Sequence, residues 1–303
     1  MENGPFAAEQ GTRLLERLAY QAHATIRRRD AEAVHDLRVA IRRLVQVVTV
    51  FKPCFAPKAS RKIRRRLKEL MECAGEVRNC DIALQFLIRP RWSDHATLRQ
   101  PMEARRKEFE QALAGALKQW VARKTSSKWR TALEAGPASA GFWHRAVTDT
   151  ARREMTRMAR DFFESGNDAV EAKASGEELH RLRLAAKKLR YTLELFAGVY
   201  GPASGTWLEQ IREVQTLLGA VNDCRTVRSL VSGMEGTREF EAALKRRQRR
   251  KTLEFRQAWR EQFSPAVARQ WTSAMRHPQG LPVRKPVGRS QAARSAPGLA
   301  AQA

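Results

Sequence analysis

The sequence predicts an all-α fold made of two similar halves. Apolar residues recur at spacings of three and four along nearly the whole chain, and no segment shows the strict alternation of a convincing strand. A ten-residue pattern, His-x-Leu-Arg-x-Ala-x-basic-basic-Leu, occurs at residues 35–44 and again at residues 180–189. Because a chance basic helix need not recur with the same offsets, we interpret the chain as two halves of about 130 residues each.

Turn-forming residues divide the chain into its predicted helices. In chain order, we expect helices near residues 6–29, 31–52, 58–78, 80–88, 95–122, 140–165, 177–199, 203–218, 223–232, 237–262 and 265–275. Glycine and proline favour turns over helix interiors, and they place the breaks at Pro53 and Pro57, Pro90, Gly136-Pro137, Gly166-Asn167-Asp168, Gly201-Pro202, Gly233 with Gly236, and Pro265. The segment near residues 125–141 is expected to join the halves.

The predicted folded domain covers residues 1–276, with one half at about residues 6–125 and the other at about residues 140–275. With 43% hydrophobic residues in a chain of 303, the protein can bury one large core or two moderate ones. From His277 onward the sequence lacks helical periodicity and is rich in proline, glycine and small side chains. We therefore expect residues 277–303 to form a disordered basic tail.

The repeated pattern places charged and apolar side chains in adjacent stripes. At about 100° per residue, His35, Arg38 and Arg42 share one stripe of a helix, beside an apolar stripe that includes Leu37 and Ile41. In the second copy the cationic stripe consists of His180, Arg183, Lys187 and Arg190. Because packing of the apolar stripe would orient the cationic one, each copy predicts an anion site.

The net charge also predicts a polyanionic partner. Lysine and arginine total 57 against 32 acidic residues, which gives a net charge of +25. The predicted tail contributes four of these charges, so 25 minus 4 leaves +21 on the folded part. A basic excess of this size favours binding to a polyanion or an anionic surface.

A second motif follows each basic helix. It reads Gly-Glu-Val-Arg-Asn-Cys-Asp at residues 75–81 and Gly-Ala-Val-Asn-Asp-Cys-Arg at residues 219–225. Asp223 is predicted to open a helix and to cap its N-terminal amides. Together with the two His-helix patterns, these motifs resemble the CHAD family, the conserved histidine α-helical domain, from about residue 6 to about residue 275. One departure is visible, because Asn79 stands where the family usually has aspartate.

The resemblance implies two antiparallel helical bundles, related by a pseudo-twofold axis, with a basic groove between them. It also implies that inorganic polyphosphate binds in this groove, where arginine and lysine replace the polymer's counterions and histidine donates hydrogen bonds. The family often accompanies a triphosphate-tunnel domain with a Glu-x-Glu-x-Lys motif. That motif is absent from the sequence, so a stand-alone member without that hydrolytic activity is expected.

A second cationic block at residues 61–68 follows the first basic helix. Its Arg64, Arg65 and Lys68 are placed to share the groove, whereas the other cations of the block are equally consistent with a solvated helix face. The basic run at residues 245–251 encircles its helix, and we assign it mainly to the surface. The residues predicted to bind polyphosphate are His35, Arg38, Arg42, Arg43, Arg64, Arg65, Lys68, Arg78, His180, Arg183, Lys187, Lys188 and Arg190.

Other site chemistries find little support in the sequence. Cys54, Cys73, Cys80 and Cys224 show no Cys-x-x-Cys spacing and no matching histidines, which predicts reduced thiols, no metal and no other cofactor. No catalytic constellation or glycine-rich phosphate loop stands out, so we expect a binding protein and not an enzyme.

No signal peptide or membrane span is predicted, and we expect a cytoplasmic protein that associates with polyphosphate granules. Two alternatives stay open at this point. The first is a helical nucleic-acid-binding protein, although the seven tryptophans are scattered and do not form a base-stacking row. The second is a metal-dependent phosphohydrolase.

Overall fold

The computed structural model describes residues 1–88, 97–136, 139–171 and 174–279, and within them the predicted all-α fold is confirmed. The only extended pairing in these residues is an isolated bridge between Glu2 and Ala146. The helices are α1 (Asn3–Arg28), α2 (Ala31–Val50), α3 (Pro57–Leu87), α4 (Arg99–Ala122), α5 (Thr125–Glu134), α6 (Ala140–Trp143), α7 (Val147–Val170), α8 (Gly176–Tyr200), α9 (Ala203–Val231), α10 (Arg238–Gln262) and α11 (Pro265–Met275). Most of the predicted tail, residues 280–303, lies outside the described residues.

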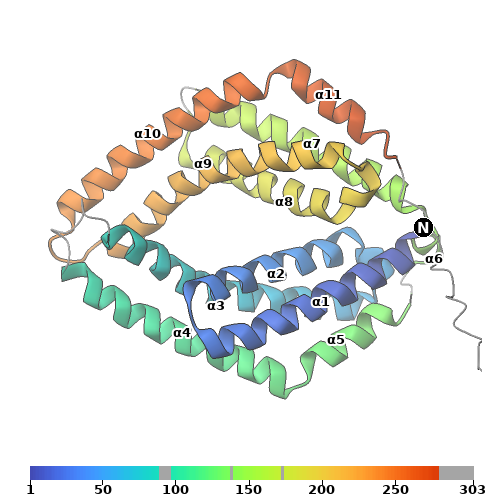
Figure 1. Ribbon diagram of the computed structural model, residues 1–303, viewed down its shortest axis with the longest axis horizontal. Coiled ribbons are helices and arrows are strands. Elements are labelled where there is room, and N and C mark those ends of the chain that lie inside the picture. The colour runs from blue at the N-terminus through green and yellow to red at the C-terminus, as the bar shows by residue number, and fades with distance from the viewer. Residues whose placement is uncertain (89–96, 137–138, 172–173, 280–303) are drawn as a thin grey trace, which may run out of the picture.

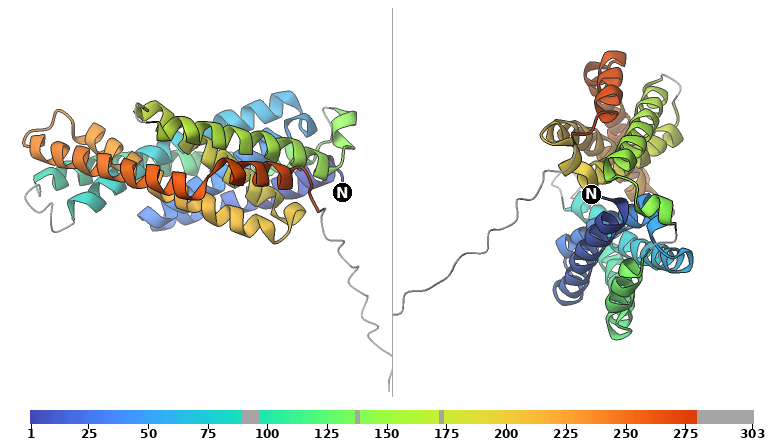
Figure 2. Two further views of the ribbon diagram at one scale, coloured as in Figure 1. Left: turned by 90° about the horizontal axis from the view of Figure 1, so that it is seen from above. Right: turned by 90° about the vertical axis from the view of Figure 1, so that its right-hand side faces the viewer.

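The helices pack in consecutive antiparallel pairs, α1 with α2, α3 with α4, α7 with α8 and α9 with α10. Figures 1 and 2 show an elongated molecule in which α1–α5 lie on one side and α7–α11 on the other. Helices α2 and α8 face each other in the middle, and α3 also contacts α9. The twofold relation between the halves stays a prediction.

One hydrophobic core runs through both halves. At its centre the ring of Phe51, at the end of α2, lies 5.9 Å from that of Phe196 in α8 and 5.5 Å from that of Phe6 in α1. Phe51 and Phe196 occupy the same offset from the histidines of their repeats. The shared core therefore fixes α2 against α8, which is the contact that brings the two basic patterns together.

Polar side chains fix the register of that contact. Gln46 of α2 donates a hydrogen bond to the Thr192 hydroxyl of α8 at 2.7 Å, and both side chains are buried. The Thr192 hydroxyl in turn donates to the Lys188 carbonyl within α8 at 2.8 Å. Because these buried groups would be left unpaired by a shift along either helix, sliding of α2 past α8 is disfavoured.

The predicted breaks after residues 78 and 218 are wrong, because α3 and α9 each run unbroken through the second motif. Asp223 therefore lies in the interior of α9 and cannot cap a helix start. Gly219 lies within α9 as well, and glycine inside a helix costs only about 1 kcal/mol relative to alanine. Burial of Val221, Cys224 and Val227 on one face of α9 offsets that cost.

The predicted break at Gly166 is also wrong, since α7 continues to Val170. A Cβ atom at Gly166 would lie 1.8 Å from Cζ2 of Trp259, which sits in α10. The Trp259 indole also donates a hydrogen bond to the side-chain oxygen of Asn167 at 3.3 Å. The glycine is thus required for a close helix contact and not for a turn.

The segment predicted to join the halves contains two helices, α5 and α6. Helix α5 packs on α1 and buries Trp129 and Leu133. The helix predicted at residues 140–165 is divided between α6 and α7, with residues 144–146 between them. The local sequence pattern favours a helix only weakly in this segment, and the packing of the short apolar stripe of α5 on α1 stabilises it.

Candidate functional site

Both repeated basic helices begin at a side-chain cap that sets where their charged stripes start. The Asp30 carboxylate accepts a hydrogen bond from the Ala33 amide at the start of α2. At the start of α8, Ser175 and Glu178 form a reciprocal capping box. Leu37 and Leu182 are fully buried at matching positions of the two patterns, so the predicted apolar stripes face the core and turn the cationic stripes toward the gap between the halves.

The basic groove is a depression of about 980 Å³ between α2, α3 and α8. Nine cationic side chains line it, together with one carboxylate, that of Glu72, which lies 3.7 Å from Lys68. The cations are Arg38, Arg42, Lys52, Arg61, Arg64, Arg65, Lys68, Lys187 and Lys188. Such an excess of positive charge in one concave surface is suited to an extended polyanion.

Arg38, Arg42 and Lys187 of this groove, together with the neighbouring Arg183 of α8, are called the inner cations below. Within the described residues none of the four has an ion pair with a carboxylate. Arg38 donates a hydrogen bond to the Met71 carbonyl at 3.3 Å, and Arg42 makes a long one of 3.5 Å to the Tyr191 hydroxyl. Guanidinium donors are thus left over for a ligand.

Burial and neighbouring charges lower the pKa of three inner cations, Lys187, Arg38 and Arg183. Burial, followed by repulsion from Arg183, Arg42 and Arg38, lowers the pKa of Lys187 to about 6. Burial and then Arg42 lower the pKa of Arg38 to about 10. At neutral pH Arg38 therefore keeps its charge, whereas Lys187 is largely neutral until an anion arrives.

One carboxylate, that of Asp223, lies near the inner cations. Burial raises the pKa of Asp223, while the charges of Arg183, Arg78 and Lys187 act in the opposite direction. Asp223 also opposes the downward shift of the Arg183 pKa that burial causes. This single carboxylate offsets part of the positive charge around Arg183 and leaves most of it uncompensated.

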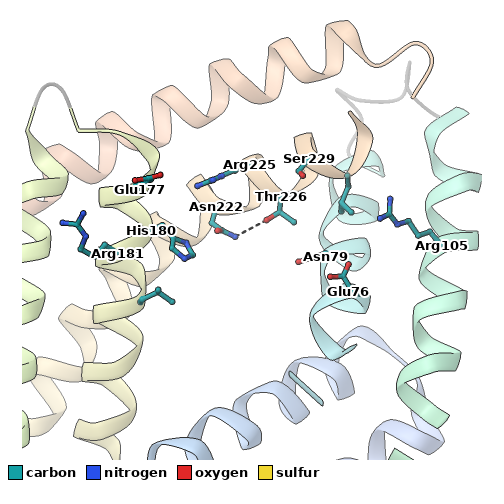
Figure 3. A pocket seen from close by; sticks show the side chains of 12 residues that line it. Glu76, Asn79, Arg105, Glu177, His180, Arg181, Asn222, Arg225, Thr226 and Ser229 are labelled. Atoms are coloured by element: carbon teal, nitrogen blue, oxygen red, sulfur yellow. Dashed lines mark hydrogen bonds between the residues drawn. The ribbon is translucent and has the colours of Figure 1, made fainter. Parts of the chain in front are cut away.

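A second pocket of about 880 Å³, the His180 pocket, lies between α3, α4, α8 and α9 (Figure 3). His180 enters it from α8, Asn222 and Arg225 from α9, and Asn79 from α3. The Asn222 amide donates a hydrogen bond to the Thr226 hydroxyl at 3.2 Å. Leu184 lines both this pocket and the basic groove, so the two adjoin along α8.

The two repeat histidines share an electrostatic environment. Desolvation lowers the pKa of His180, and Arg183 and Arg225 lower it further. For His35, desolvation and then the charge of Arg78 lower the pKa. Both imidazoles are thus kept neutral near pH 7, and each would gain a proton beside a bound anion.

Comparison with known proteins identifies the family. The sequence model of the CHAD domain family matches residues 9–232 of this chain. The chain belongs to the CHAD domain family.

Two solved structures share the CHAD fold seen here. The CHAD domain from the plant Ricinus communis has a TM-score of 0.68 and 20% sequence identity, over 92% of this chain and 94% of that chain. PptA from Streptomyces chartreusis has a TM-score of 0.64 and 14% identity, over 86% of this chain and 100% of that chain. At these identities the likeness concerns the fold. None of the curated proteins compared with the chain matches it.

In this CHAD protein the structure brings most of the predicted site residues together. Seven of them line the basic groove, namely Arg38, Arg42, Arg64, Arg65, Lys68, Lys187 and Lys188. His180 lines the adjoining pocket. Arg183 lies close enough to Lys187 to lower its pKa, and Arg78 does the same to His35. The predicted contacts of these residues with polyphosphate stay predictions.

Two predicted residues, Arg43 and Arg190, are placed elsewhere. Arg43 donates to the Glu194 carboxylate at 2.9 Å, and Arg190 lies 3.6 Å from the same side chain. Arg190 also donates to the Tyr191 hydroxyl at 2.7 Å. Neither residue lines the basic groove. Their positive charge is largely engaged in the contact between α2 and α8.

Sequence reasoning missed some lining residues of this CHAD site. Lys52 and Arg61 line the basic groove, and Arg225 lines the His180 pocket. Arg61 stands three and four residues before Arg64 and Arg65, so helical spacing alone could have added it. For Lys52 and Arg225 no local signal was available, because their position depends on the packing of distant helices.

Two further features are absent from the described residues. They contain no group of three or more His, Cys, Asp or Glu side chains that could hold a metal ion. No helix among them is long and apolar enough to cross a membrane.

Proposed function

We propose that this protein binds inorganic polyphosphate in the basic groove and does not act on it chemically. The observation that carries the proposal is the set of inner cations, which are packed together without an ion-pair partner in the described part of the chain. Charges held in this way repel one another, as the depressed pKa of Lys187 indicates. A linear polyanion with one charge per phosphate relieves that repulsion and accepts the unused guanidinium donors.

The groove suits polyphosphate better than nucleic acid. Among its lining residues Tyr191 is the only aromatic one, and it is buried, so no platform is available on which bases could stack. Three inner cations, Arg38, Arg42 and Lys187, line the groove, where the bare phosphates of a polyphosphate chain can approach them closely. Sugars and bases would hold the phosphates of RNA farther from them.

A competition titration tests this proposal. Long-chain polyphosphate and a single-stranded RNA of equal total charge are titrated into the protein, and dissociation constants are compared at matched salt. We expect polyphosphate to bind at least tenfold more tightly than RNA and no phosphate to be released during the incubation. Equal affinity would favour the nucleic-acid alternative, and release of phosphate would favour the phosphohydrolase.

We further propose that this binding places the protein on polyphosphate granules in the cytoplasm. A fluorescent fusion of the protein is expected to co-localise with stained granules in cells that accumulate polyphosphate. The variant with Arg38→Gln and Arg42→Gln is expected to be diffuse, since it lacks two inner cations. A fusion that stays on the granules after this change would show that another surface targets it.

A further inference from the structure

A pocket of about 350 Å³ between α3, α4 and α5, called here the α5 pocket, is not explained by the repeated pattern. Five cations line it, Lys62, Arg65, Arg66, Arg123 and Lys128, together with the Glu69 carboxylate. Glu69 pairs with Arg66 at 2.8 Å and, more distantly, with Arg65 at 3.8 Å. Lys62, Arg123 and Lys128 have no ion-pair partner among the described residues, so the pocket carries surplus positive charge.

A buried donor without an acceptor lines the same pocket. Trp120 is 2% exposed and packs edge-on against Trp129 with ring centroids 5.8 Å apart. Its indole Nε1 is buried and has no hydrogen-bond partner in the part of the chain that the structure describes. A buried N–H group without an acceptor is rare in folded proteins and is destabilising. An oxygen atom of a bound anion would remove this cost.

The start of α5 adds a third feature that favours an anion. Helix α5 begins at Thr125, which lines the pocket, after Lys124 in the left-handed conformation with φ 49°. It has neither a side-chain cap nor an acidic residue in its first turn. The first N–H groups of a helix carry partial positive charge and bind oxyanions where no side chain caps them.

We propose that the α5 pocket is a second phosphate-binding site. Surplus cations, an orphaned indole N–H and an uncapped helix start all require the same kind of ligand, a compact oxyanion with several acceptor oxygens. Arg65 lines both the α5 pocket and the basic groove, so the two sites adjoin across α3. If the proposed function holds, a long polyphosphate chain leaves the groove at Arg65 and places a later phosphate in the α5 pocket.

Charge-removal variants with a matched control test the site. The double variant Arg123→Gln with Lys128→Gln removes two of its unpaired cations. Its control, Lys107→Gln with Lys118→Gln, removes two exposed and unpaired lysines of α4 that do not line it. For long-chain polyphosphate, we expect the first variant to lower the affinity about tenfold and the salt slope by about two, one for each lost contact. The control should change both far less, and equal effects would overturn the proposal.

The Trp120 indole gives a readout that is local to the α5 pocket and separate from the overall affinity for polyphosphate. The seven tryptophans produce seven indole N–H signals in a ¹H–¹⁵N spectrum, and the signal missing from Trp120→Phe belongs to Trp120. We expect this signal to move on titration with long-chain polyphosphate, and the Arg123→Gln, Lys128→Gln variant to abolish the change. A similar shift with inorganic phosphate would show that the site also takes the free anion.

The outcomes separate this site from the proposed function. If polyphosphate binds the wild type tightly while neither anion moves the Trp120 signal, the basic groove stands and the α5 pocket is refuted. If long-chain polyphosphate does not bind but inorganic phosphate moves the signal in a saturable way, the pocket stands and the proposed function fails.

Discussion

Lys187 is the groove residue whose protonation state is expected to change most when an anion binds. Burial and four neighbouring arginines lower its pKa to about 6, so the amine is largely uncharged at pH 7 in the free protein. A bound polyanion favours the ammonium form, and binding therefore takes up a proton. The desolvated imidazoles of His35 and His180 respond in the same direction. Affinity is thus expected to rise as pH falls from about 8 to about 6.

Proton uptake can be measured by calorimetric titration in buffers of different ionisation enthalpy. At pH 7.5 we expect Lys187 to contribute uptake of about one proton per bound chain. Lys187→Met should lose this contribution. Lys188→Met is the matched control, since Lys188 lines the same groove on the same helix but is exposed. If Lys187→Met takes up as many protons as the wild type, the histidines or other groups carry the pH response.

The same burial predicts that Lys187 destabilises the free protein. Because its folded-state pKa of about 6 lies below the ordinary value of 10.5, the unfolded chain binds more protons between these two pH values. The penalty therefore falls as pH rises through this window. We expect Lys187→Met to raise the free energy of unfolding at pH 7 by about 1–3 kcal/mol. Urea denaturation should show this gain shrinking toward pH 10, and a pH-independent gain would contradict the account.

At the residue scale, helical spacing was sufficient to place Arg38, Arg42 and Lys187 on stripes that face the groove. It could not show that Arg43 pairs with Glu194, because the two residues are 151 positions apart in the sequence. Nor could it show that Asp223 lies among the inner cations. Both facts depend on how α2, α8 and α9 pack, and this information is not contained in local periodicity.

At the element scale, Gly166 is a glycine whose role is close packing between helices and not the formation of a turn. An alanine Cβ there would overlap the Trp259 ring, which is itself packed between Phe162 and Phe263. Helices α7 and α10 would have to move apart, so we expect Gly166→Ala to lower the free energy of unfolding by about 2–3 kcal/mol. The change is measured by urea denaturation of the free protein.

Gly219 in α9 is the matched control, because nothing lies within 4 Å of a Cβ atom added there. Both glycines are interior helix positions, so alanine gains helix propensity at each of them. We expect Gly219→Ala to be neutral or to raise the free energy of unfolding by up to about 1 kcal/mol. Equal destabilisation by the two substitutions would show that the contact with Trp259 is not the cause.

Gly166 and Gly219 also show why the bounds of some helices could be predicted and those of others could not. Long amphipathic helices such as α1, α2 and α8 were predicted close to their observed bounds, because their apolar stripes are continuous. A break was predicted at Gly166 from the general preference of glycine for turns, and another after residue 218 because Asp223 was expected to open a helix. The sequence does not show whether a glycine serves a turn or a close helix contact, since this depends on the residue that packs opposite.

At the scale of the whole molecule, the continuous core makes one site from two halves. Arg38 and Arg42 come from α2, Arg183 and Lys187 from α8. Arg183 lowers the pKa of Arg38, and Arg38 and Arg42 lower that of Lys187. A polyphosphate chain bound in the groove, as proposed, would therefore contact both halves at once. If the halves bound separately, each would retain its own affinity after the other was changed.

This difference yields a quantitative prediction for two double variants, Arg38→Gln with Arg42→Gln and Arg183→Gln with Lys187→Gln. Each is expected to lower the slope of log affinity against log salt by about two, and all four changes together by about four. The melting temperature should fall little, because the charged ends of these side chains lie off the apolar stripes. The Lys107→Gln, Lys118→Gln variant controls for the loss of two charges from the whole protein. Two independent half-sites would instead give a second, unaffected binding phase in each double variant, and a salt slope that none of these changes alters would exclude the groove as the binding surface.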